Sequence, residues 1–165
     1  MEIEFGNYAD GLFRFALSLT RDFHAAEDLV QDCMLRAHKS VNQLNDAQAV
    51  KSWLFRIMVN LFRDEARRRQ ATFVDYEVDE TGGRVPAPDE AAISREMIQS
   101  VFQAMQQLPD QQRHVLHLSV VEQFSNSEIA DLLATSTNNV KSNLSVARKN
   151  LRKQLAKLDR IEAEA

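Results

Sequence analysis

The chain of 165 residues is poor in the residue types on which several protein classes depend: it has one cysteine, three prolines and four glycines. A single cysteine excludes an internal disulfide. Cys33 falls in an apolar helical pattern, which predicts a small buried thiol rather than a redox or metal site. With 44% hydrophobic residues and so few glycines and prolines, the composition indicates a helical globular protein.

Long apolar runs are also missing from the sequence. No stretch approaches the roughly eighteen consecutive apolar residues that a membrane-spanning helix needs. The N-terminus reads MEIEFGNYAD, which is acidic and has no continuous apolar stretch, so it does not resemble a signal peptide. We therefore expect no membrane insertion and a cytoplasmic location.

The motifs that usually carry catalysis are absent as well. The sequence shows no nucleophile–base arrangement, no glycine-rich phosphate-binding loop and no metal-binding motif. His114 and His117 are three residues apart in a helical stretch, but no third and fourth ligand follows in register, which favours surface or core histidines. We expect no catalytic residue, no metal and no cofactor, and hence a protein that is not itself an enzyme.

The negative charge of the chain, formally −4 at pH 7, is confined to its middle. Residues 1–70 carry ten basic and ten acidic side chains and residues 96–165 carry eight of each, whereas residues 71–95 carry six acidic and two basic ones. This middle segment also contains two of the prolines and two of the glycines and lacks helical periodicity, as is typical of a linker. We predict an all-α protein with two small helical domains, residues 1–70 and 94–165, joined by an acidic flexible linker over residues 71–93.

A helix-turn-helix pattern lies in the C-terminal domain. Ser125 and Glu128 have the spacing of a capping box, in which both side chains bond free first-turn amides, so a helix begins there. That helix is predicted to bury Ile129, Leu132 and Leu133. Residues 134–136 supply a turn. The next helix carries an apolar stripe at helical spacing, formed by Val140, Leu144, Ala147 and Leu151.

The other face of this last helix is polar and basic. Residues 141–157 contain six Lys or Arg and no Asp or Glu, and Asn and Ser occupy the first turns. Cations suit phosphate contacts, and Asn and Ser suit base edges, as in a helix that reads DNA in the major groove. A basic amphipathic helix is also compatible with an ordinary solvated face.

The N-terminal domain contains three amphipathic helical patterns, over residues 8–18, 24–38 and about 47–69. A polar break over residues 42–46 precedes the third pattern. The predicted buried stripe of the third helix consists of Trp53, Leu54, Ile57, Met58 and Leu61. This helix ends in RDEARRR at residues 63–69, which is more positive charge than a favourable interaction with the helix dipole requires.

Together these patterns resemble a known family, the extracytoplasmic-function (ECF) sigma factors of bacterial RNA polymerase, within the sigma-70 family. The family's core-polymerase-binding helix is similar to HAAEDLVQDCMLRAHK at residues 24–39. Its promoter-melting helix is similar to KSWLFRIMVNLFRDEARRR at residues 51–69. Its C-terminal promoter-binding domain is similar to LPDQQRHVLHLSVVEQFSNSEIADLLA followed by NNVKSNLSVARKNLRK. The resemblance places sigma region 2 at residues 1–70 and sigma region 4 at residues 94–165.

The resemblance implies a protein that binds core RNA polymerase and directs promoter recognition and transcription initiation. It implies polymerase binding through Asp28, Leu29, Gln31, Asp32 and Leu35. It implies binding and melting of the downstream promoter through Asn45, Lys51, Arg56, Asn60, Arg63 and Arg67. It implies binding of the upstream promoter element through Asn138, Asn139, Lys141, Ser142, Asn143, Arg148 and Lys149. The expected partners are core RNA polymerase, promoter DNA and an anti-sigma factor.

The turn and the start of the last helix depart from the family pattern. The family commonly has glycine and a branched apolar residue where this chain has Ala134 and Thr135, and often has glycine and threonine at Asn138 and Asn139. It often has arginine at Asn143. Because Asn favours adenine and Arg favours guanine, these departures affect which promoter sequence is read.

Two other functions fit parts of the sequence. A self-sufficient helix-turn-helix regulator would use the C-terminal domain alone. A sigma-like adaptor or decoy would bind an anti-sigma factor without opening promoters. The RDEARRR run and the intact melting-helix pattern argue against the decoy, whereas the altered turn favours it.

Overall fold

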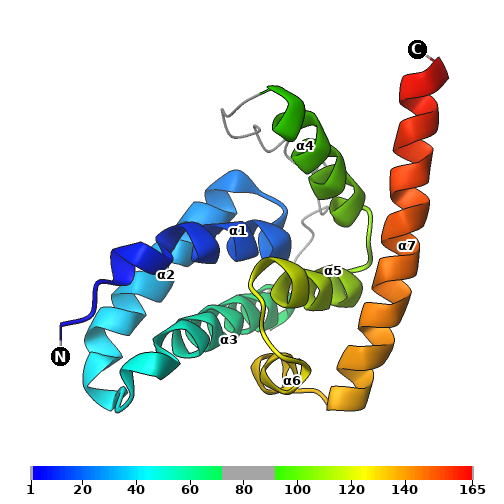
Figure 1. Ribbon diagram of the computed structural model, residues 1–165. Coiled ribbons are helices and arrows are strands. Elements are labelled where there is room, and N and C mark those ends of the chain that lie inside the picture. Colours follow the sequence, from blue (N-terminus) through cyan, green and yellow to red (C-terminus); the bar gives the residue numbers. More distant parts are fainter. Residues whose placement is uncertain (1, 72–91, 165) are drawn as a thin grey trace. The chain divides into compact units, whose positions relative to one another are not determined.

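A computed structural model describes residues 2–71 and 92–164, and these residues form an all-α protein, as predicted (Figure 1). The chain divides into two compact units, Met1–Arg84 and Val85–Ala165. Most of the predicted linker, residues 71–93, lies outside the described residues. No helix in the described ranges is long and apolar enough to cross a membrane.

Over residues 2–71, the described part of the first unit, the chain forms three α-helices: α1 (Ala9–Thr20), α2 (Phe23–Ser40) and α3 (Val50–Ala71). Three short 3₁₀ turns accompany them: η1 (Phe5–Tyr8), η2 (Val41–Gln43) and η3 (Ala47–Ala49). The turn between α1 and α2 places Arg21 in the left-handed region, with φ of 56°. Asp22 then caps α2, because its carboxylate accepts a hydrogen bond of 2.7 Å from the Ala25 amide.

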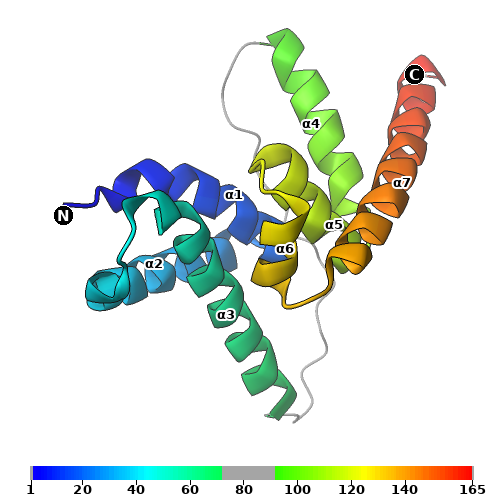
Figure 2. The ribbon, with the colours of Figure 1, turned by 60° about the horizontal axis from the view of Figure 1, so that its bottom comes forward.

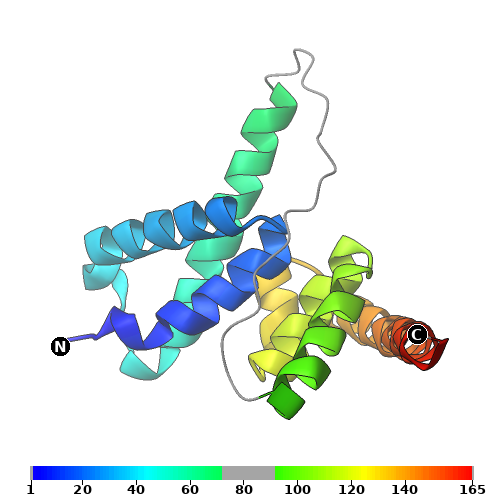
Figure 3. The ribbon, with the colours of Figure 1, turned by 90° about the horizontal axis from the view of Figure 1, so that it is seen from above.

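All three helices contribute to one core, and each packs on the other two (Figure 3). Phe15 of α1 stacks on Phe55 of α3 with ring centroids 5.4 Å apart. The buried positions of α3 are Val50, Leu54, Phe55, Met58 and Val59. The predicted stripe was therefore partly wrong, because Trp53, Ile57 and Leu61 are only half-buried. Because α3 packs against two helices, its buried face is rotated from the predicted stripe and includes Phe55 and Val59.

Cys33 is buried in this core, which confirms the prediction from its helical pattern. Its Sγ donates to the Leu54 carbonyl oxygen at 3.4 Å, so the thiol connects α2 to α3. Burial raises the pKa of the Cys33 thiol to about 12.

We expect Cys33 to resist thiol reagents while the first unit is folded, because a pKa of about 12 leaves on the order of one thiol in ten thousand ionised at pH 8. An unfolded thiol ionises near its ordinary value of 9.0. The unfolded state therefore loses its proton first as the pH rises, and stability falls as the pH rises from 9.0 toward 12. Mass spectrometry after labelling with and without urea measures this protection, and rapid labelling of the native chain would contradict it.

The second unit contains α4 (Ala92–Gln106), α5 (Asp110–Leu116), the π-helical turn η4 (His117–Val121), α6 (Asn126–Leu133) and α7 (Thr137–Glu164). The long helix α7 packs against α4, α5 and α6 (Figure 2). The core between α5, α6 and α7 is apolar and includes Val115, Leu116, Leu118, Ile129, Leu132, Val140, Leu144 and Ala147. This core orients the basic helix relative to the turn that precedes it.

Three buried polar side chains distinguish the α5 region, Arg113, His117 and Glu122, and a core position for His117 was one of the two interpretations of the sequence. Arg113 is 1% exposed and donates from Nη1 to the Leu108 carbonyl oxygen at 3.1 Å and from Nη2 to Asp110 Oδ1 at 2.9 Å. His117 is also buried, and its Nε2 lies 3.4 Å from Oε1 of the buried Glu122. The buried Arg113 guanidinium requires such partners, so its two hydrogen bonds hold the start of α5 against Leu108 and Asp110.

Candidate nucleic-acid interface

The helix-turn-helix begins with the predicted capping box at α6. The Ser125 hydroxyl accepts from the Glu128 amide at 3.2 Å, and the Glu128 carboxylate accepts from the Ser125 amide at 2.7 Å. The helix ends at Ala134, which has left-handed backbone angles of φ 52° and ψ 49°. Glycine adopts this conformation at lower cost, so the atypical alanine turn is formed despite some backbone strain.

Helix α7 turns one face to the core and the opposite face to solvent. Val140, Leu144 and Ala147 are fully buried, as predicted, and Leu151 is half-buried. The side directly opposite carries exposed residues at helical spacing: Asn138, Ser142, Ser145 and Lys149. Ser145 was not among the predicted site residues, although the same spacing could have identified it.

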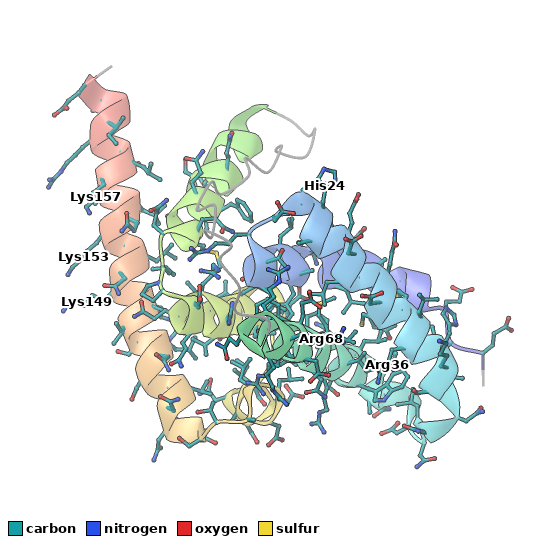
Figure 4. All side chains as sticks on the ribbon, turned by 180° about the vertical axis from the view of Figure 1, so that it is seen from behind. His24, Arg36, Arg68, Lys149, Lys153 and Lys157 are labelled. Carbon is teal, nitrogen blue, oxygen red and sulfur yellow. The ribbon has the colours of Figure 1, made fainter. Side chains whose placement is uncertain are left out.

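Positive charge extends from Lys149 on this face toward the C-terminal end of α7. Figure 4 shows Lys149, Lys153 and Lys157 pointing away from α4 and α5 along one edge of the helix. All three are exposed, as are Lys141 and Arg148. The predicted upstream-promoter residues thus lie on one helix, with the short polar side chains in its first turns and the cations in the following ones.

A ladder of hydrogen bonds connects the turn to the first turns of α7. Asn139 Nδ2 donates to the Thr135 hydroxyl at 2.7 Å, and Asn143 Nδ2 donates to Asn139 Oδ1 at 3.2 Å. The Asn139 amide in turn donates to the Ser136 hydroxyl at 3.1 Å. Asn143 is half-buried, unlike the other predicted base-reading residues. The ladder replaces the glycine–threonine start that is common in the family and gives Asn143 a defined orientation.

In the first unit, α2 presents an exposed stripe formed by Asp28, Gln31, Asp32 and Leu35. These residues follow helical spacing, so they share one face. Leu35 is 59% exposed, which is unusual for a large apolar side chain beside acidic ones. Leu29, which was predicted for the same contact surface, lies outside this exposed stripe, because its side chain is buried in the core with 9% of its surface exposed.

Helix α3 carries a second exposed stripe on the side opposite its core, where Arg56, Asn60, Arg63 and Arg67 follow at four-, three- and four-residue spacing. Arg63 is half-buried, and the other three residues are exposed. The predicted Lys51 does not join this stripe. It precedes Arg56 by five residues, which is about 140° around the helix, and its ammonium lies 6.0 Å from the centroid of the Phe55 ring.

The loop before α3 projects Asn45 into solvent. The preceding Leu44 is buried, and the following Asp46 caps the next turn by accepting from the Gln48 amide at 2.9 Å. Asn45 is therefore an exposed residue on a loop that is anchored at both ends. Trp53 lies near the loop in sequence, is half-buried and has its ring centroid 6.2 Å from that of Phe5.

Among the described side chains, no group of three or more His, Cys, Asp or Glu is arranged to hold a metal ion. The polar faces of α2, α3 and α7 instead consist of residues that suit protein and nucleic-acid contacts.

The comparisons with known proteins agree with these features. The Sigma-70 region 2 family matches residues 5–72, and the Sigma-70 region 4 family matches residues 98–151. The chain is 34% identical over 162 residues to the ECF RNA polymerase sigma factor SigL of Mycobacterium tuberculosis, covering 96% of this chain and 90% of the relative. The chain belongs to the ECF sigma factors.

A second ECF sigma factor is similar in sequence, and a solved sigma factor is similar in fold. SigW of Bacillus subtilis is 29% identical over 161 residues, which cover 92% of this chain and 86% of the relative. The sigma factor RpoE of Bartonella quintana, solved in complex with the anti-sigma factor NepR, has a similar fold, with a TM-score of 0.73 and 24% identity over 92% of this chain and 94% of that one. In the present chain, the region 2 match spans α1, α2 and α3. Helix α7 continues beyond the region 4 match to Glu164.

Proposed function

We propose that this ECF sigma factor binds core RNA polymerase through α2 and directs it to promoters through the Asn45 loop, α3 and α7. The observation that carries the proposal is the presence, in both matched regions, of an exposed polar face opposite a buried apolar one. The α2 face is acidic with one exposed leucine, as suits a protein partner with basic groups. The α3 and α7 faces are rich in Arg, Lys, Asn and Ser, as suits DNA.

Each face has a distinct task in this proposal. Asn45 reads an extruded base of the melted strand, and the α3 stripe holds its phosphates, which offsets the few kcal/mol that unstacking a base costs. The start of α7 reads base edges of the upstream element, and Arg148 and Lys149 contact phosphates. Catalysis belongs to the polymerase, and the chain acts with it in the bacterial cytoplasm.

Co-purification with core polymerase followed by run-off transcription tests the proposal. A sigma factor will be retained by core polymerase and will start transcription at defined sites. Retention without transcripts would indicate a decoy that does not open promoters. Promoter binding without retention by polymerase would indicate a self-sufficient regulator.

We expect the base contacts and the phosphate contacts of α7 to have different effects across a library of promoter sequences. Asn143→Ala will reduce the favourable free energy of binding by roughly 1–3 kcal/mol for promoters with the preferred base pair and will relax specificity at that base pair, because it removes a base contact. Lys149→Ala will weaken binding to all promoter sequences alike, because phosphates carry no sequence information. Binding of both variants by the holoenzyme, measured across the library at one salt concentration, checks this. Identical profiles for the two variants would show that the division of roles is wrong.

We also propose an anti-sigma factor as a partner of the free chain. The membership of the ECF family supports this, as does the fold shared with RpoE, which was solved with the anti-sigma factor NepR. A protein that covers the acidic α2 face or the basic α7 face would keep the chain from polymerase or promoter. Co-purification of the tagged chain from cells that lack free core polymerase would isolate such a partner.

A further inference from the structure

A polar groove of about 320 Å³ lies between the start of α6 and the first half of α7. Its lining consists of Asn126, Lys141, Leu144, Ser145, Arg148 and Arg152. Asn126 is the first residue of α6, and all the others belong to α7. Leu144 is a buried core residue, so it forms the floor of the groove, whereas the surrounding side chains are polar.

Three cations converge on this groove and no acidic side chain lines it. Within the described part of the chain, Lys141, Arg148 and Arg152 have no hydrogen-bond or ion-pair partner. This differs from Arg67 and Arg69 of α3, which lie 3.9 Å and 3.6 Å from carboxylates on their own helix. Three neighbouring positive charges repel one another, and an anion in the groove would relieve that repulsion.

The α6 side of the groove adds hydrogen-bond donors. The capping box uses the amides of Ser125 and Glu128. Asn126, the only α6 residue in the groove lining, is the first residue of the helix, and its backbone amide has no acceptor among the described residues. Asn126 thus adds hydrogen-bond donors beside the three cations, and the Ser145 hydroxyl supplies a further donor on the α7 wall.

We propose that this groove holds one backbone phosphate of promoter DNA, with Arg152 and Ser145 as phosphate ligands in addition to Lys141 and Arg148. The inference rests on the proposed function of α7 as the promoter-reading helix. Ser145 supports a DNA phosphate because it borders both the groove and the exposed face with Ser142 and Lys149. A strand whose phosphate occupies the groove therefore passes directly beside the residues that face the bases. The groove would set the register of the helix on the duplex.

The test uses holoenzyme assembled from the full chain and core polymerase, with promoter duplexes that each carry one neutral methylphosphonate in place of a phosphate. Arg152→Gln removes one cation from the groove. Lys153→Gln is the matched control, because it removes the same charge from the adjacent exposed residue, which does not line the groove. Circular dichroism verifies that both variants keep the wild-type helix content.

We expect Arg152→Gln to weaken binding about tenfold for every promoter sequence and to lower the salt dependence by about one phosphate contact. The decisive result is at one phosphate position. At that position the methylphosphonate will strongly weaken promoter binding by the wild type and by Lys153→Gln. It will weaken binding by Arg152→Gln only slightly, because that variant has already lost the contact. The same sensitivity of Arg152→Gln and Lys153→Gln at every position would overturn the groove proposal while leaving the sigma function intact. Failure of the wild-type holoenzyme to bind any promoter would refute the sigma function itself.

Discussion

Replacing both Asp28 and Asp32 by lysine will weaken the binding of the chain to core RNA polymerase by about tenfold or more, without unfolding the first unit. Both carboxylates are exposed on the same face of α2, in the two turns that precede Leu35 in the exposed stripe. Reversing two charges that face a basic partner turns attraction into repulsion, which slows association and speeds dissociation. A titration of labelled chain with core polymerase measures the loss, and circular dichroism verifies the fold.

Glu27→Lys provides the matched control for this experiment. Glu27 is exposed on the same helix but lies about 100° around it from Asp28. Its carboxylate is 4.0 Å from His24 Nδ1 in an exposed pair, so its loss has little effect on stability. If Glu27→Lys weakened assembly as much as Asp28→Lys or Asp32→Lys, the partner would respond to the net charge of α2 and not to a defined contact surface.

Arg113→Ala will destabilise the second unit by about 3 kcal/mol or more. The side chain is 1% exposed and is the largest one that is fully buried among the described residues. Its removal leaves a cavity and deprives the Leu108 carbonyl oxygen of its guanidinium donor. Because α5 packs on α7, loosening α5 also loosens the support of the DNA-reading helix.

Urea unfolding followed by hydrogen exchange measures this effect in each unit separately. Exchange protection will fall in α5, α6 and α7, while the amides around Cys33 in α2 keep theirs. Arg148→Ala is the control, since this exposed arginine has no partner in the described structure and its loss leaves stability nearly unchanged. Equal stability of Arg113→Ala and Arg148→Ala would show that the buried guanidinium contributes nothing net.

Local signals in the sequence determined the helices and their caps. The Ser125 to Glu128 spacing defines the start of α6, because a capping box depends only on residues within one turn. The stripe from Val140 to Ala147 defines the buried face of α7 by its period alone. The concentration of acidic residues in the middle segment likewise depends only on the order of residues. These features are local, and no knowledge of distant contacts is needed to read them.

Only the tertiary structure decided which residue lies at the centre of each face. Periodicity leaves an uncertainty of about one residue, or 100°, around a helix. Packing of α3 on two helices buried Phe55 and Val59 and left Trp53 half-exposed, and packing of α2 placed Leu29 inside, next to the exposed Asp28. Each choice depends on the shape of neighbouring helices, which the sequence of one helix does not contain.

Contacts between distant residues were beyond the reach of sequence patterns for the same reason. Cys33 meets Leu54 across 21 residues, and the Asn150 amide donates to Gln112 across 38 residues, joining α7 to α5. The groove beside α6 arises in the same way, since it exists only where Asn126 comes to lie next to α7. The sequence by itself determined the residue types available for binding polymerase and DNA. The packing of the helices decided which of these residues lie together at a surface, because burial depends on neighbours that are distant along the chain.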